Sequence, residues 1–479
     1  MQRAMDTDVA ELWALTEPDG SVERPGHLGA WILATWVGVG MVVLLPAIFS
    51  YFTPGATGDE WLLALVVTTI CGTRYAWIVA DGRRRLFEMS FWVFTYVFLG
   101  IAPLVQLRTG QTPYTAPQID TTLQLDAMVL IIIGIVAFVV GLSVPSPRRG
   151  FLPKSYGVTG VGLARTLLLA AFALLLDMYF VSKVGVENLF SSREDLARAI
   201  QSAWPESFIA VLISAATTMS TLVAFIALVK CIRQTKTREW PLIALTVVVG
   251  LALAITVNPI SNARYVFGSA ALAVAALFGL FATPRLFRLT AIVWLIALIV
   301  VFPLADAFRY SKGGEFKSTT PLESLTSPDF DAVAQINNTL LYVEREGISE
   351  GAQAAGVLLF WVPRRFWPDK PQDTGIVIAE NRGYEFKNLS SPIWAELYIN
   401  GGWLLLVIGM VGLGILARSQ DTRIEENLRR ARAPSILSCI LPFYLMILLR
   451  GSLLQAMSFL FAILGCAVFV SRWERISPR

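Results

Sequence analysis

The chain has 479 residues, of which 55% are hydrophobic and only 15% are charged, and its formal net charge is +4. Soluble domains carry about 25% charged residues, and the mean hydropathy here is +0.61. The composition therefore excludes a soluble globular protein and indicates a membrane protein of many spans. The four cysteines have no CxxC spacing, so they support neither a disulfide framework nor a thiolate metal site.

A polar N-terminal tail, residues 1–26, precedes a first apolar run that is long enough to cross a membrane and remain there. A helix needs about 20 apolar residues to cross roughly 30 Å of hydrocarbon. The sequence therefore predicts an all-α polytopic membrane protein of about twelve transmembrane helices. The predicted spans are residues 28–51, 61–80, 89–107, 124–144, 161–182, 207–229, 240–257, 265–282, 288–307, 393–416, 434–449 and 453–471.

Positive charges fall mainly in alternate connections between these spans. They are found in residues 82–85, 147–154, 230–239, 284–288, 418–432 and 471–479. Cytoplasmic loops carry such an excess of Lys and Arg, so both termini are expected in the cytoplasm. The chain then divides into the cytoplasmic tail 1–26, nine helices in 27–308, a long extracytoplasmic loop in 309–392, and three helices with a cytoplasmic tail in 393–479.

The long outer loop is predicted to contain short helices. Residues 327–347 have the apolar spacing of a helix with one buried face, with Ser327 or Asp329 as N-cap and Gly347 just past the end. Residues 351–361 form a second helical run. Asp329 and Asp331 have the spacing of a metal-holding DxD pair, but their position before a helix favours N-capping. A long loop of this kind is usually functional.

Ionisable residues gather at the predicted outer ends of several spans. They are Arg264, Asp306, Arg309, Glu396 and Arg450, and the loop segment "WVPRRFWPDKPQDTG" (361–375) adds Arg364, Arg365 and Lys370. Helix-end arginines can simply extend toward lipid headgroups, which also explains Arg74 in the second span. Several cations at one depth instead predict a functional site.

The chemistry of this rim favours an anionic lipid headgroup. A planar guanidinium can bond two phosphate oxygens at once, and a lipid-linked diphosphate lies at about this depth. The single histidine, His27, is at the cytoplasmic start of the first span. Histidine-based catalysis and a His-rich metal site are therefore excluded at the outer rim, and no metal is expected there.

Two runs, "FWVPRRFWPDKP" (360–371) and "SPIWAELYINGG" (391–402), resemble the oligosaccharide repeat-unit polymerases of the Wzy type. The resemblance is firmest from about Phe330 to Gly414, and "NARY" (262–265) and "RG" (450–451) are similar too. Some members carry an Arg-x10-Gly pattern, which the pairs Arg364–Gly375 and Arg345–Gly356 fit, whereas Arg264 and Arg309 do not.

The resemblance implies a metal-independent membrane glycosyltransferase without a cofactor, similar in fold to the C-type glycosyltransferases. It would lie in the bacterial plasma (inner) membrane and join undecaprenyl-diphosphate-linked oligosaccharides into O-antigen, capsule or exopolysaccharide at the outer face. The expected partners are the lipid bilayer and the flippase and chain-length regulator proteins of the same pathway, with no nucleic acid.

Chemical grounds assign roles to the rim residues. Diphosphate binding is predicted for Arg264, Arg309, Arg364, Arg365, Lys370 and Arg450. The five arginines of this set would also stabilise the charge on the leaving group, with Arg364 and Arg450 as the catalytic candidates. Glu396, or else Asp306, would accept the proton of the acceptor hydroxyl. Trp361 and Trp367 would stack on sugar rings or join an interfacial aromatic belt.

Three other functions remain open at this point. A ligase would move finished glycan to another acceptor, but ligases of this kind typically use an outer histidine, which this chain lacks. A flippase or transporter of the lipid-linked oligosaccharide usually has charges at mid-membrane and repeated halves, which are not evident here. A structural subunit with a docking loop would leave the rim arginines unexplained.

Overall fold

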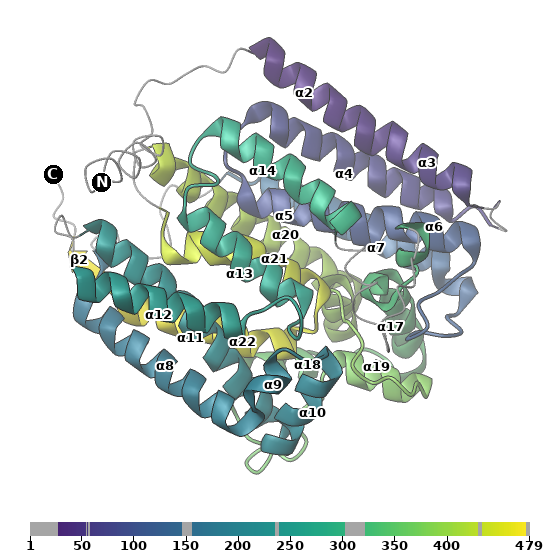
Figure 1. The fold of residues 1–479 in the computed structure, drawn as a ribbon. Helices are drawn as coiled ribbons and strands as arrows, with labels where there is room; N and C mark the ends of the chain where they lie inside the picture. The colour runs from purple at the N-terminus through teal and green to yellow at the C-terminus, as the bar shows by residue number, and fades with distance from the viewer. Residues whose placement is uncertain are drawn as a thin grey trace.

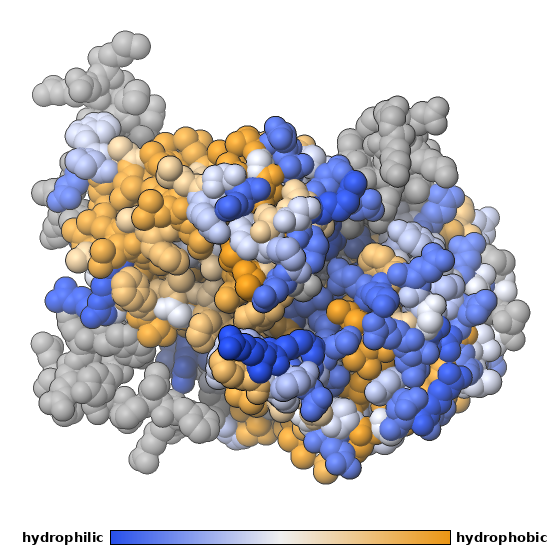
Figure 2. All heavy atoms as spheres, turned by 90° about the horizontal axis from the view of Figure 1, so that it is seen from below, coloured by the Kyte–Doolittle hydropathy of each residue, from blue (hydrophilic) through white to orange (hydrophobic). Residues whose placement is uncertain are grey.

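The computed structural model describes residues 27–53, 55, 58–145, 156–234, 239–301, 321–429 and 434–475. Within these ranges the chain is mostly helical with almost no sheet (Figure 1), and eight helices are long and apolar enough to cross a membrane. Figure 2 shows a broad hydrophobic surface on the helix bundle and a mainly hydrophilic surface at one end. The expected all-α membrane architecture is confirmed at this level, and the number of twelve spans stays a prediction.

Three of the eight long helices consist of two or three consecutive segments, and all eight are given next with their bounds. They are α2 (His27–Val39) with η1 (Gly40–Leu44) and α3 (Leu45–Phe52), α4 (Trp61–Asp81), α5 (Leu86–Tyr96) with η2 (Val97–Ile101) and α6 (Ala102–Thr109), η3 (Thr121–Leu123) with α7 (Gln124–Ser143), α8 (Leu163–Val184), α11 (Ser207–Gln234), α20 (Ile393–Arg429) and α22 (Leu453–Val470).

The other predicted spans correspond to shorter helices. They are α12 (Trp240–Thr256), α13 (Arg264–Leu277), α21 (Ile436–Arg450), and α14 (Pro284–Ile296) with η4 (Ala297–Val301). Between the long helices lie α9 (Val186–Leu189), α10 (Arg193–Ala203), α16 (Pro321–Ser324), η5 (Pro328–Phe330), α17 (Ala332–Glu346), α18 (Ala352–Leu358) and α19 (Thr374–Arg382). The strands β1 (Tyr156–Val161) and β2 (Ser471–Arg475) pair antiparallel.

The bundle has two distinct ends (Figure 1). The strands β1 and β2 lie at one end, here called the strand end, and α17 and α19 lie at the other, here called the loop end. Both helices that the sequence predicts in the long loop are found, as α17 and α18, and Gly347 directly follows α17 with a φ of +82°.

Wide π-helical turns precede prolines in the sequence. η1 ends two residues before Pro46, and η2 ends two residues before Pro103. A proline ring clashes with the carbonyl one turn earlier and lacks an N–H, and a π-turn relieves this conflict without ending the helix. The sequence places Pro303 at the same spacing after η4.

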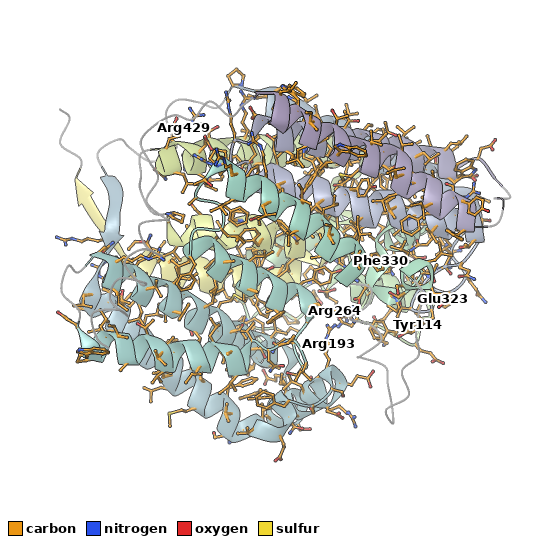
Figure 3. All side chains as sticks on the ribbon, turned by 45° about the horizontal axis from the view of Figure 1, so that its top comes forward. Tyr114, Arg193, Arg264, Glu323, Phe330 and Arg429 are labelled. Carbon is orange, nitrogen blue, oxygen red and sulfur yellow. The ribbon has the colours of Figure 1, made fainter. Side chains whose placement is uncertain are left out.

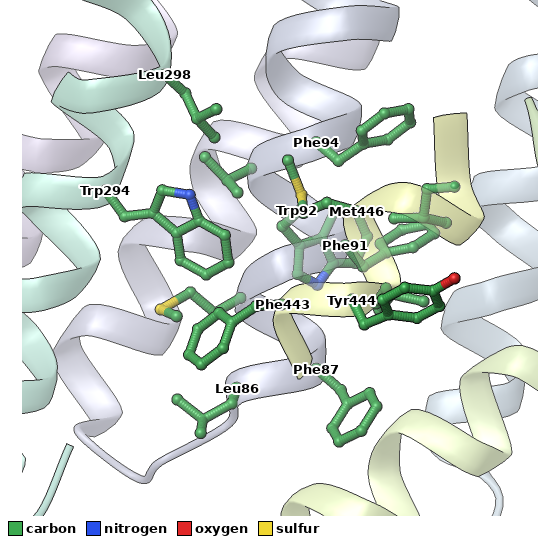
Figure 4. Close-up of a cluster of buried hydrophobic side chains, with 14 of the residues drawn as sticks. Leu86, Phe87, Phe91, Trp92, Phe94, Trp294, Leu298, Phe443, Tyr444 and Met446 are labelled. Carbon is green, nitrogen blue, oxygen red and sulfur yellow. The ribbon is translucent and has the colours of Figure 1, made fainter. Parts of the chain in front are cut away.

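The helix α5 forms the centre of the bundle. Every residue of α5 is buried, and α5 packs against α4, α20 and α21. Figure 4 shows aromatic side chains of α5, including Phe91, Trp92 and Phe94, beside Phe443 and Tyr444 of α21. Phe91 also stacks on Phe138 of α7 with ring centroids 3.5 Å apart. The hydrophobic core therefore joins segments that are far apart in the sequence.

The helix α17 is more deeply buried than the sequence predicts. A single apolar face was expected, yet all residues from Ala332 to Leu341 are buried, among α7, α19 and α20. Its polar residues find partners inside the protein. Asn337 donates to the Asp120 carbonyl at 2.8 Å, and Asn338 accepts from the Tyr384 hydroxyl at 3.2 Å. The predicted apolar face is buried, and burial extends beyond it to these amides, although Asn337 Oδ1 has no hydrogen-bond partner.

The helix α20 is kinked near its start. Gly401 and Gly402 have non-helical backbone angles, with φ of +60° at Gly402. The carbonyls of Ile399 and Asn400 accept hydrogen bonds from the N–H groups of Ser349 and Gly351, at 2.8 and 2.9 Å. The kink thus holds the connection between α17 and α18 at the loop end.

Candidate functional site

Two of the predicted rim arginines meet on one carboxylate. The Asp329 side chain lies 3.2 Å from Arg264 Nη1 and 3.8 Å from Arg450 Nη2. Arg264 begins α13 and Arg450 ends α21, so helices from distant parts of the chain bring the two guanidinium groups together. Asp329 belongs to η5, in the loop region that the sequence places at the same rim.

Arg450 is fixed by several acceptors at once. Its Nε donates to the Asp329 carbonyl at 3.0 Å, and its Nη2 donates to the Pro328 carbonyl at 3.1 Å and to Asp331 Oδ1 at 3.3 Å. Its guanidinium also lies over the Tyr265 ring, 4.8 Å from the centroid. A planar fork that is held in this way is preorganised for a second anion.

Ser327 and Asp331 occupy the N-cap positions of η5 and α17, and Asp329 lies inside η5. Ser327, before η5, and Asp331, before α17, make no side-chain cap hydrogen bond. Instead Asp331 Oδ1 accepts from the Ser390 hydroxyl at 2.7 Å as well as from Arg450. Ser327 is therefore at a predicted N-cap position, but neither Ser327 nor Asp331 caps its helix through a side-chain hydrogen bond. The DxD spacing was the sequence signal for a role other than capping, although the charged partners of Asp329 and Asp331 are arginines.

An elongated cavity adjoins Arg264. It has a volume of about 680 Å³ and follows α13 toward the strand end. Its wall is mostly apolar and includes Phe267, Leu272, Trp294, Leu298, Phe443 and Met446. Figure 4 shows Trp294 and Leu298, from α14 and η4, on the same side of the cluster as Phe443 of α21. The cavity thus lies in the apolar part of the bundle.

Polar residues occupy one end of this cavity. Arg193 of α10 and Asn262 join Arg264 in its wall, and Figure 3 shows Arg193 beside Arg264. Lining residues Ile260 and Val293 expose more than half of their side-chain surface, so the cavity can be reached from the side. Arg193 was not among the predicted site residues, because its position in the third outer connection gave no sign that α10 approaches α13.

Glu396 is a buried carboxylate near the same corner. It is 1% exposed, its Oε2 accepts from the Thr374 hydroxyl at 3.0 Å, and its Oε1 accepts from the N–H of Leu453 at 3.2 Å. Leu453 is the first residue of α22 and follows Arg450 by three residues, so Glu396 and the arginine pair lie on either side of the corner between α21 and α22.

Asp373 lies next to this carboxylate in the structure. It precedes α19, where its Oδ1 accepts from the N–H of Gly375 at 3.0 Å. Burial raises the pKa of Asp373 above the ordinary aspartate value, although hydrogen bonds to the carboxylate oppose the shift. Asp373 was not among the predicted site residues.

The segment 361–375 uses two of its cations to hold its own backbone. Arg364 donates to the carbonyls of Lys370 and Pro371, at 2.6 and 3.3 Å. Lys370 is 8% exposed and donates to the carbonyls of Phe360 and Val362, at 2.6 and 3.0 Å. Burial, and next the nearby Arg364, lower the pKa of Lys370. The diphosphate-binding role of these two residues stays a prediction.

The remaining predicted residues lie apart from these contacts or outside the described ranges. Arg365 is exposed, Trp361 is exposed with its ring edge-to-face against Phe360, and Trp367 is half-buried. Asp306 and Arg309 fall outside the residues that the structure describes. The structure therefore brings Arg264 and Arg450 together, with Glu396 across the same corner.

Comparisons with protein families, with curated proteins and with solved structures found no match to this chain.

Proposed function

We propose that this protein polymerises undecaprenyl-diphosphate-linked oligosaccharides into a surface polysaccharide. The observation that carries the proposal is the apolar cavity along α13 with Arg193 and Arg264 at its polar end. A cavity of this kind suits an amphiphile, because its hydrocarbon chain gains free energy from burial and its phosphates pair with guanidinium groups. The resemblance of the sequence to the Wzy-type polymerases supports the same substrate.

The proposed reaction transfers the growing glycan from its lipid to an incoming repeat unit. The terminal hydroxyl of the incoming glycan attacks the anomeric carbon of the growing chain, and the bond from that carbon to the diphosphate breaks. A glycosidic bond forms, the hydroxyl proton passes to a carboxylate, and undecaprenyl diphosphate leaves. Arg264 and Arg450 would stabilise the negative charge that develops on the diphosphate.

Asp329 would keep the two arginines in position between turnovers. Its carboxylate occupies the space between them, where a diphosphate would bring stronger and multiple acceptors. Glu396 is the proposed proton acceptor, because it lies across the α21–α22 corner from Arg450. It is deeply buried, so the acceptor hydroxyl would reach it only within the protein interior. Arg365, Trp361 and Trp367 remain proposed contacts for the glycan, and Asp306 and Arg309 remain further candidates.

Substitution of Arg264 tests this function. In a reconstituted assay with lipid-linked repeat units, Arg264→Gln should reduce the rate of polymer formation about 10²–10³-fold, as loss of one preorganised hydrogen-bond donor does at an oxyanion hole. Arg198→Gln is the matched control, because Arg198 is an exposed arginine of α10 that pairs with the neighbouring Asp195. Equal polymer from both variants would overturn the assignment.

A strain that lacks the gene separates the rival functions. Single repeat units on the lipid are expected if the protein is the polymerase. Long chains that stay on the lipid would instead indicate a ligase. Repeat units that accumulate on the inner leaflet would indicate a flippase.

A further inference from the structure

A second cavity lies at the strand end of the bundle, away from the arginine site. It has a volume of about 610 Å³, and its walls belong to α4, α5, α7 and α20. Figure 3 shows Arg429, one of its lining residues, at the opposite end of the helices from Arg264. The proposed polymerase reaction makes no use of this cavity.

One face of the last turns of α20 supplies much of its wall. The lining residues of α20 are Arg418, Asp421, Thr422, Glu425, Glu426 and Arg429. Residues three and four apart on a helix share a face, so one side of the last turns of α20 presents both positive and negative charges to the cavity. Opposite it stand Arg74, Trp77, Arg83, Arg85 and Glu88. The cavity thus has five arginines and four carboxylates.

A buried carboxylate fixes two of the arginines. Glu88 is 2% exposed and forms ion pairs with Arg74 at 2.7 Å and with Arg85 at 2.9 Å. Both guanidinium groups lie over the Trp77 ring, 4.1 and 4.3 Å from its centroid. Asp421 is also engaged, because it accepts from the N–H groups of Phe87 and Glu88 at 2.8 and 3.0 Å. These contacts fix the positions of Arg74, Arg85 and Asp421 in the wall.

Both signs of charge remain available to a ligand. A guanidinium has five N–H donors. Arg74 uses its Nε and Nη2 on Glu88, and Arg418 uses its Nη1 on the Leu142 carbonyl, which leaves further donors on each. Glu425 pairs with Arg84 and Arg429, whereas no ion pair within the described residues involves the exposed Glu426.

The cavity also reaches into the apolar part of the bundle. Arg74 lies seven residues before Asp81, the last residue of α4, which is about 10 Å along a helix axis. Ile70 and Val139 line the cavity at this level, and Val139 is 40% exposed on the apolar helix α7. An ion in water would gain nothing from these side chains, but a lipid chain would.

We propose that this cavity binds the headgroup of a phospholipid that carries both a phosphate and a primary ammonium, as an ethanolamine headgroup does. Arg74 and Arg418 bind the phosphate, Glu426 accepts hydrogen bonds from the ammonium, and the acyl chains lie along Ile70 and Val139. Pockets between transmembrane helices that carry basic residues are known to hold lipid headgroups. The mixed charges favour a zwitterion over a purely anionic lipid.

Native mass spectrometry of the full-length protein tests the ammonium contact. Lipids with ethanolamine, choline or glycerol headgroups and identical acyl chains would be compared. The protein should retain the ethanolamine lipid about tenfold better than the others, since a charge-assisted hydrogen bond contributes about 1.5 kcal/mol. Choline has no N–H donor and glycerol has no cation. Equal retention of all three lipids would overturn the proposal.

Two substitutions with matched controls locate the headgroup. Glu426→Gln should lose the preference for ethanolamine, whereas Glu380→Gln, an exposed acid of α19 that pairs with Lys387, should keep it. Arg418→Gln should weaken all three lipids about tenfold relative to Arg198→Gln. An unchanged preference in Glu426→Gln contradicts the proposal even if Arg418→Gln fails to fold.

Soluble phosphoethanolamine provides the last arm of the test. It carries a phosphate and a primary ammonium but no acyl chains, so it should bind at least about tenfold more weakly than the lipid. Binding as tight as that of the lipid would mean that the ligand comes from water and would overturn the assignment to a lipid.

Discussion

Cations in this protein differ in what their charge is used for. Lys370 is buried and its ammonium group satisfies two backbone carbonyls, so its first role in the structure is to hold the segment 361–375 together. Arg450 also binds backbone carbonyls, but it shares Asp329 with Arg264 at the end of an open cavity. The residue type alone does not separate these two uses, because the difference depends on the distant segments that surround each side chain.

The buried carboxyl group of Asp373 makes the stability of the protein depend on pH. Burial raises its pKa in the folded protein above the unfolded value. The native state is therefore favoured while the carboxyl is protonated, and it loses this advantage as the pH rises through the folded-state pKa. Asp373→Asn removes the titration and keeps an oxygen to accept the Gly375 N–H.

The expected result is a difference between thermal unfolding profiles that grows with pH. Wild type and Asp373→Asn should unfold at similar temperatures near the ordinary aspartate pKa of about 4, and the wild type should fall progressively behind as the pH rises above it. Differential scanning fluorimetry in one detergent would measure this. A difference that shrinks with rising pH would contradict the prediction.

The close packing of α7 against α20 depends on glycines at the contact between the two helices. A Cβ on Gly414 would lie 2.2 Å from the Phe138 carbonyl oxygen, and one on Gly141 would lie 2.1 Å from the Val411 carbonyl oxygen. Small residues let helices approach closely in a membrane, where packing drives association. The nearby Gly412 has no atom within 4 Å of its Cβ position, so the same helix contains its own control.

Gly414→Ala should destabilise the protein by about 1–3 kcal/mol, because backbone atoms of α7 would have to move. Gly412→Ala should leave stability unchanged or raise it by up to about 1 kcal/mol, because Ala has the higher helix propensity. Unfolding midpoints of both variants would be compared with the wild type. Equal effects at the two positions would show that helix contact does not decide the outcome.

Most helices could be predicted from the sequence. Their irregular turns could be predicted only in part. The prolines Pro46 and Pro103 are visible in the sequence, but a kink, a break and a π-turn are all possible beside a proline. Which one forms depends on packing around α3 and α6. The burial of α17 was harder to predict, since a sequence with Asn337 and Asn338 in the helix reads as half exposed.

The candidate site could also be predicted only in part, because its contacts depend on how distant segments pack. Arg264 and Arg450 could be placed at one membrane depth from hydropathy and charge. Their common partner Asp329 could not be predicted, because Asp329 is 65 residues from Arg264 and 121 residues from Arg450 in the sequence. Arg74 was explained by its reach toward lipid headgroups, whereas in the structure it pairs with the buried Glu88.

At the scale of the whole molecule, charge is concentrated at the two ends of an apolar bundle. The loop end contains the arginine site with its apolar cavity, and the strand end contains the mixed-charge cavity between α4 and α20. The long helix α20 contributes to both ends, with Glu396 in its first turn and Arg418 and Arg429 near its last. The two proposed binding regions can therefore be tested separately by substitutions in one helix.

The central position of α5 has a consequence for biogenesis. Its neighbours α20 and α21 emerge late, since Ile393 follows Tyr96 by roughly 300 residues, and ribosomes need about 15–60 s for such a length at about 5–20 residues per second. During that interval α5 lacks α20 and α21, although Arg74 and Arg85, which pair with Glu88 in the complete structure, have already been synthesised. A chain that ends at Pro392 should therefore insert and then be degraded faster than the full chain, which pulse-chase labelling would reveal. Equal half-lives would mean that α5 finds adequate partners before α20 is made.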